Sequence, residues 1–175
     1  MTKINGYTCR CCGTYHEEIP TSYGSAAPFY YYDAEPEERE DRFEMNDDLC
    51  VMDGEHFFMR GSIEIPIIGT DEHFIWGVWV SLSQANFDKV NECWDKQELL
   101  EPMFGWLSTD LPYELETVNL KTMVHPRADG IRPYIELEPT DHPLAVEFRE
   151  GITMERVQEI AEQLCVNNED DEEEC

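Results

Sequence analysis

The chain is organised around the stretch YTCRCCGTYHEEIP, which spans residues 7–20. Two thiolates separated by two residues and followed by a glycine form a turn that can place both sulfurs on one metal ion. Cys9 and Cys12 have this spacing, and Gly13 supplies the backbone freedom that the turn needs after the second sulfur. His16 can add an imidazole nitrogen to the same site. The stretch therefore predicts an N-terminal knuckle that binds Zn²⁺.

A closed zinc site needs a fourth ligand, and no second pair of cysteines with this spacing exists in the sequence. Our first choices are Cys50 and His56, because each lies on a short apolar run that is expected to return toward the core. Weaker candidates are His73, Cys93, His125, His142 and Cys165. The predicted metal ligands are Cys9, Cys12, His16 and Cys50.

Two other interpretations of the N-terminal cysteines stay open. A thioredoxin-like redox pair places its first cysteine at a helix N-terminus in a βαβ unit, whereas here Gly13 follows the pair and no such unit follows. Free cysteines can also be packed or exposed thiols that bind nothing. We favour the metal site, since Arg10 brings positive charge to the thiols and should favour their ionised, metal-binding form.

The formal net charge of −27 at pH 7 limits the partners that the chain can have. Acidic residues concentrate in the runs 33–48 and 169–174. Nucleic-acid binding is not expected, because phosphate contacts need clustered Lys and Arg, and anionic membrane surfaces are disfavoured for the same reason. A basic protein partner, or simply high solubility, is compatible with this charge.

The cysteine pattern and the N-terminal residues indicate a cellular compartment. The seven cysteines are an odd number at uneven spacings, and the N-terminus lacks the basic and apolar regions of a signal peptide. No apolar run approaches the about 18 residues of a membrane-spanning helix. We therefore expect a cytoplasmic protein in a reducing environment, without structural disulfides.

The pattern of apolar residues predicts an α+β fold. Strands are expected over residues 49–52, 56–68, 74–82, 117–124 and 131–137. Asp53-Gly54 is a strong hairpin signal, and the most apolar run, 74–82, is expected at the sheet centre. Helices are expected over 84–95, 141–149 and 153–165, the second of them capped by Asp141. We expect an antiparallel sheet of about five strands with packed helices and the N-terminal Cys/His metal knuckle.

The length of 175 residues is sufficient for one domain with its own core. We expect a single α+β domain over residues 1–166. Residues 167–175 are expected to form a disordered acidic tail, because six consecutive acids bury no apolar surface and repel one another.

Six motifs along the chain carry a resemblance to a known family. They are Cys9-x-x-Cys12-Gly13-x-x-His16, Asp48-Leu49-Cys50-Val51, His56-Phe57-Phe58-x-Arg60-Gly61, Trp76-Gly77-Val78-Trp79-Val80-Ser81-Leu82-Ser83, Gly105-Trp106-Leu107 and Leu137-Glu138-Pro139-Thr140-Asp141-His142-Pro143-Leu144-Ala145. From Cys9 to about Ile160 the chain resembles the bacterial family named domain of unknown function 2199. The resemblance implies a bacterial single-domain protein and assigns no chemistry to any residue.

Two functions of different classes remain compatible with the sequence. The leading one is a cytosolic, zinc-binding interaction protein, of an immunity type, that acts on a basic partner. The alternative is a zinc-dependent hydrolase with an open Cys9/Cys12/His16 site, in which water occupies the fourth position. The His56/Arg60 and Asp141/His142 pairs could serve as catalytic groups, but no partner nucleophile or phosphate-binding loop accompanies either pair. Whether the protein is an enzyme is not decided by the sequence.

Overall fold

The computed structural model describes residues 6–10 and 12–167, with backbone alone at 97–99 and 165–167. Its strands are β1 (Tyr7–Thr8), β2 (Tyr15–His16), β3 (Ser22–Gly24), β4 (Phe43–Met45), β5 (Leu49–Met52), β6 (His56–Pro66), β7 (His73–Leu82), β8 (Met103–Leu107), β9 (Lys121–His125) and β10 (Tyr134–Leu137). Its helices are α1 (Phe29–Asp33), α2 (Arg39–Arg42), α3 (Gln84–Glu92), α4 (Pro143–Glu150) and α5 (Met154–Asn167), with 3₁₀ turns η1 (Pro36–Glu38) and η2 (Trp94–Leu99).

The main sheet has eight strands in the order β3-β7-β8-β9-β10-β6-β5-β4, and β7 also pairs with β6. Strands β6, β7, β8, β9 and β10 therefore close into a barrel-like ring, from which the remaining three strands extend. The fold is α+β, as predicted. The prediction of an antiparallel sheet was wrong in part, because β10 runs parallel to β6 and β3 runs parallel to β7.

The ring closes at the start of β10, where this strand pairs with β6. The amide of Ser62 on β6 donates to the carbonyl of Pro133 at 2.9 Å, and Tyr134 pairs with Ser62. Strand β10 runs antiparallel to β9, the preceding strand in the sequence. On its other side it pairs with β6, and it runs parallel to that strand. Hydrogen bonds then run around the whole ring, so that none of its strands has a free edge along its full length.

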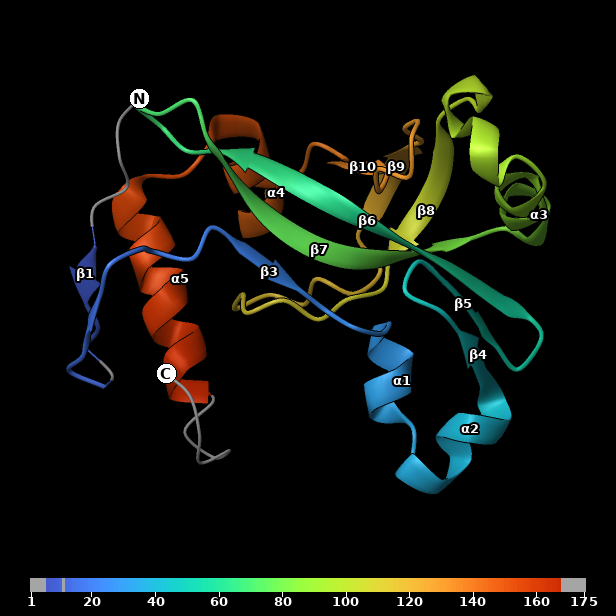
Figure 1. Ribbon diagram of the computed structural model, residues 1–175, viewed down its shortest axis with the longest axis horizontal. Helices are drawn as coiled ribbons and strands as arrows, with labels where there is room; N and C mark the ends of the chain where they lie inside the picture. Colours follow the sequence, from blue (N-terminus) through green and yellow to red (C-terminus); the bar gives the residue numbers. More distant parts are fainter. Residues whose placement is uncertain (1–5, 11, 168–175) are drawn as a thin grey trace.

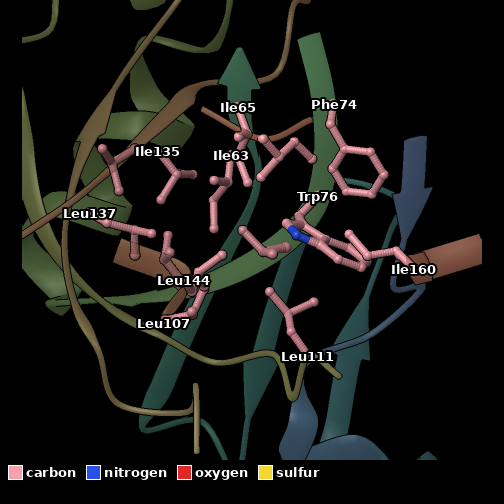
Figure 2. Close-up of a cluster of buried hydrophobic side chains, with 14 of the residues drawn as sticks. Ile63, Ile65, Phe74, Trp76, Leu107, Leu111, Ile135, Leu137, Leu144 and Ile160 are labelled. Carbon is pink, nitrogen blue, oxygen red and sulfur yellow. The ribbon is translucent and has the colours of Figure 1, made fainter. Parts of the chain in front are cut away.

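Alternation along the long strands decides which side chains fill the ring. On β6 and β7 the inward positions include Ile63, Ile65, Trp76 and Val78, all at most 2 % exposed. Figure 2 shows the inward side chains meeting those of β8, β10, α4 and α5. A second, smaller cluster on the outer face combines α1 with the β4–β5 end of the sheet around Phe58 and Trp79.

Several local predictions are confirmed. Asp53 and Gly54 form the turn between β5 and β6 with φ of 55° and 67°. Ser83 caps α3 by accepting from the amide of Asn86 at 3.2 Å. The cap of α4 was predicted wrongly, because the side chain of His142, not of Asp141, accepts from the amide of Leu144.

The acidic tail falls almost entirely on residues that the structure leaves out. Asn167 ends α5, and residues 168–175 lie outside the described part of the chain. The division into a domain of residues 1–166 and a tail of residues 167–175 therefore stays a prediction. No helix in the described ranges has the length and apolar character needed to cross a membrane.

Candidate metal centre

The N-terminal knuckle is a small hairpin. Strands β1 and β2 pair antiparallel, with Tyr7 opposite His16. Between them the amide of Cys9 donates to the carbonyl of Thr14 at 3.0 Å, and the amide of Gly13 donates to the carbonyl of Cys9 at 2.8 Å. Gly13 has φ of 68°, the left-handed region that favours glycine, as the spacing had predicted. These bonds bring the chain back on itself within a few residues.

The turn assembles three potential metal ligands. The ligand atoms of Cys9, Cys12 and His16 all lie within 4.8 Å of one another. The Sγ atom of Cys12 is 3.6 Å from Nε2 of His16. A tetrahedral zinc ion with bonds of about 2.3 Å to sulfur and about 2.0 Å to nitrogen holds such a pair about 3.5 Å apart. The donor set and its spacing therefore fit Zn²⁺ with little rearrangement.

The three side chains differ in exposure. Cys9 is 1 % exposed and belongs to the main core, together with Tyr7 of β1 and Ile160 of α5. Cys12 is exposed, and His16 is half-buried. A metal bound here would lie at the boundary between core and solvent.

Hydrogen bonds at the knuckle lower the pKa of one thiol, that of Cys12. The bond to His16, followed by bonds from Thr14, lowers the pKa of Cys12 from 9.0 to about 6. Cys12 is therefore mostly a thiolate at neutral pH, which is the form that binds metal. Arg10, expected to provide this effect, instead points to Glu162 of α5, with 3.8 Å between Nε and Oε2.

Cys50, the predicted fourth ligand, is not part of this group. It lies on β5, fully buried in the second cluster with Phe58 and Trp79, and burial raises the pKa of its thiol to about 12. Figure 1 shows β5 and β1 at opposite ends of the molecule. The apolar run around Cys50 does return to a core, but to a different one from the core that holds Cys9.

The other candidate ligands are dispersed. His56 is exposed at the start of β6, and His73 is exposed at the start of β7. Nε2 of His125 is 3.4 Å from Oε1 of Glu136, and Cys93 is the C-cap residue of α3. Within the residues whose side chains are described, Cys9, Cys12 and His16 are the one group of three or more that could hold a metal ion. The side chain of Cys165 is outside this set.

The Asp141/His142 pair is not arranged as a catalytic base. Nδ1 of His142 accepts from the amide of Leu144 at 3.1 Å, and Nε2 lies 3.0 Å from the carbonyl of Glu116. Both ring nitrogens are thus occupied by the backbone, and Nε2 must carry the proton to donate. His142 therefore caps α4 and connects this helix to the backbone of Leu115 and Glu116.

Sequence reasoning missed two neighbours of the knuckle. The ring of Tyr7 stacks on that of His16, with centroids 5.2 Å apart and an angle of 25° between the rings. Glu162 approaches from α5 and is 16 % exposed at its side chain. The cross-strand position of Tyr7 could have revealed the stacking, whereas no local signal connects Glu162 to the knuckle.

A comparison with protein families identifies the family of this chain. The model of a family described as uncharacterised protein conserved in bacteria (DUF2199) matches residues 8–152. The chain belongs to this family. The matched residues include the whole metal group and the barrel, and they end before α5. No curated protein and no solved structure matches the chain.

Proposed function

We propose that this DUF2199 protein binds one Zn²⁺ through Cys9, Cys12 and His16, and that the ion has a structural role. The observation that carries this is the position of Cys9, a ligand that is 1 % exposed and packed in the main core beside α5. A metal held by that sulfur and by two surface ligands would crosslink the hairpin and fix its turn around the one ligand that is packed in the core. Short β-strands of two residues each have little stability of their own, so such a crosslink is useful.

The surroundings of the group support a structural rather than a catalytic ion. Substrate sites are usually concave, and three cavities lined wholly by described residues include none of Cys9, Cys12 and His16 in their walls. The carboxylate of Glu162, which approaches the knuckle from α5, faces Arg10 and accepts from Gln158 at 2.8 Å. If the ion has only a structural role, the function is carried by other parts of the protein surface.

The function that we propose for that surface is binding of a basic protein. The support is the net charge of −27 together with the exposure of the acidic segment that follows α1. Glu37, Glu40 and Asp41 are all exposed there, on η1 and α2. Nearby arginines are already engaged, Arg42 with Asp53 at 3.0 Å and Arg39 over the ring of Tyr31 at 4.7 Å. Complementary charge of this kind speeds encounter with a cationic partner.

Elemental analysis of protein purified without an affinity tag tests the metal. We expect about one zinc per chain in the wild type, and loss of it in Cys9→Ser and Cys12→Ser. Cys93→Ser is the matched control, because Cys93 is a half-buried thiol outside the group, and it should retain the metal. A folded wild-type protein without metal would overturn this part of the proposal.

Association kinetics test the partner. Immobilised protein should capture a basic polypeptide from its host at low salt, and the purified pair should associate more slowly as salt screens the charges. Replacing Glu37→Gln, Glu40→Gln and Asp41→Asn together should lower the association rate. The control is Asp71→Asn with Glu72→Gln, an exposed acidic pair at the β6–β7 turn. Association that ignores both salt and the triple replacement would refute the interaction.

A zinc hydrolase is the second candidate. One observation favours it, namely that the described residues contribute three ligands and Cys12 is exposed, so that water can take the fourth position. Zinc-loaded protein would then hydrolyse simple ester, amide or phosphoester substrates, and Cys12→Ser would abolish the activity. Absence of turnover across these three classes by fully zinc-loaded protein would remove this candidate.

A further inference from the structure

A cavity of about 280 Å³ is lined by residues of β3, β7, α5 and the segment that follows β8, and by none of the three metal-group residues. Strands β3 and β7 contribute Tyr23 and Trp76, and the segment after β8 contributes Leu111 and Pro112. Leu164 of α5 completes an apolar wall. In Figure 2, Leu111 lies next to Trp76 in the core cluster that this wall continues.

The segment that forms one side of the cavity is irregular but rigidly held. Oγ1 of Thr117 accepts from the amide of Leu111 at 2.9 Å and donates to the carbonyl of Thr109 at 2.9 Å. Oγ1 of Thr109 in turn accepts from the amide of Trp79 at 2.8 Å. These atoms are buried, so the bonds are protected from water and the cavity is formed before any ligand arrives.

The same segment places one charge at the cavity. Thr109 and Leu111 are buried, and Asp110 between them is exposed. Asp110 lines the cavity, and no Lys, Arg or His residue does. Within the described residues Asp110 forms neither an ion pair nor a side-chain hydrogen bond. An unpaired carboxylate beside an apolar wall is complementary to a group that is cationic at one end and apolar along its length.

We propose that this cavity binds an alkylammonium group, with the ammonium at Asp110 and the alkyl chain against Leu111, Pro112 and Leu164. The partly buried ring of Tyr23 adds a surface that attracts cations. The group can belong to a free amine or to the lysine side chain of a protein, and both present the same chemistry. The proposal does not depend on zinc, so it can fail while the metal site holds. If the source is a lysine, the cavity gives a basic partner a specific anchor.

NMR titration of the full chain with n-pentylammonium at pH 7 tests the proposal, because it detects weak binding and locates it. We expect saturable shifts of the amides of Tyr23, Asp110 and Leu111 and of the indole N–H of Trp76. Pentanol lacks the charge, pentanoate reverses it, and methylammonium lacks the apolar chain, so each should bind more weakly. Asp110→Asn should weaken pentylammonium binding about fivefold, the effect of one exposed ion pair. Asp88→Asn, an exposed replacement on α3, should not weaken it.

A lysine-containing peptide and the same peptide with acetylated lysines distinguish the two sources. Binding of the first peptide but not the second supports a protein lysine, and binding of pentylammonium alone supports a free amine. Equal binding of pentanol and pentylammonium would overturn the proposal. So would equal effects of Asp110→Asn and Asp88→Asn, or shifts confined to residues outside the cavity.

Discussion

The Cα atom of Gly61 on β6 faces the side chain of Ile135 on β10. A methyl group on the Cα atom of Gly61 would come within 2.6 Å of Cδ1 of Ile135 and 3.0 Å of the carbonyl oxygen of Pro133. Because β10 closes the ring by pairing with β6, this contact sets how closely the two strands approach. The absence of a side chain at Gly61 is therefore a requirement of the closed sheet.

Gly61→Ala should destabilise the protein by about 1–3 kcal/mol, the usual cost of an overpacked core. Urea unfolding measures the change. Ile135→Val removes the Cδ1 atom that the new methyl group would strike, so in the Gly61→Ala background it should recover part of the loss. If the two replacements are simply additive, the contact between these residues does not limit the approach of the strands.

A chain of partly buried hydrogen bonds should also control stability. The indole of Trp76 donates to the hydroxyl of Tyr113 at 3.2 Å, and that hydroxyl donates to Glu147 of α4 at 2.8 Å. Arg156 of α5 donates to the same carboxylate at 2.8 Å. Glu147→Gln removes the charge that strengthens two of these bonds, and we expect a loss of about 1.5–3 kcal/mol in urea unfolding.

Glu150→Gln is the control for this network. Glu150 lies on the same helix and is exposed, so its replacement should change the unfolding free energy by less than about 0.5 kcal/mol. Equal effects of the two replacements would show that the network contributes no more than a surface charge.

The proximity of Cys9, Cys12 and His16 could be predicted from the sequence because the geometry of their turn is local. Cys9, Cys12, Gly13 and His16 lie within one tight turn, where spacing alone restricts the possible arrangements. The same local reasoning could not identify a fourth ligand. The apolar run around Cys50 indicates burial, and it contains no information on which of two clusters buries the thiol.

The same distinction explains the partial success with the sheet. Alternation along β6 identifies the inward face of the strand, and the Asp53-Gly54 pair identifies the β5–β6 turn. Alternation does not identify the neighbouring strand, so the parallel contact of Tyr134 with Ser62 could not be found. Strand β8 is absent from the predicted strands because Pro102 and Gly105 interrupt its region, although buried Met103 and Leu107 alternate with exposed Phe104.

In metal-free protein the thiols should differ sharply in reactivity. Cys12 has its pKa lowered from 9.0 to about 6, mainly by the bond to His16, so iodoacetamide should alkylate it readily at pH 7. His16→Gln should slow this reaction. Cys50 is fully buried and its pKa is raised to about 12, so it should stay unmodified until the protein unfolds. Mass spectrometry of the labelled peptides measures both.

The two shifts also predict opposite pH dependences of stability in metal-free protein. The stabilising contribution of the Cys12 thiolate is complete above the unfolded value of 9.0 and is lost as the pH falls toward about 6. Cys50 favours its neutral form in the native state, so stability should decline as the pH rises above 9.0 and the unfolded thiol ionises. Urea midpoints of the wild type and Cys12→Ser between pH 6 and pH 9 isolate the first effect. A stability difference independent of pH would contradict the assigned shift.

Removal of the proposed zinc ion should loosen one end of the molecule before the rest. A ligand at about a hundred times its dissociation constant contributes about 2.7 kcal/mol, and a chain of this size loses about 2–4 °C of melting temperature per kcal/mol. A strong chelator should therefore lower the melting temperature of the zinc-loaded wild type by about 5–10 °C. Cys9→Ser should melt at the same temperature with and without chelator. Because Cys9 shares the main core with Ile160 of α5, hydrogen exchange on chelation should rise in β1, β2 and α5, while β4 and β5 at the opposite end stay protected. A uniform rise along the chain would mean that the ion stabilises the fold as a whole and not the hairpin against α5.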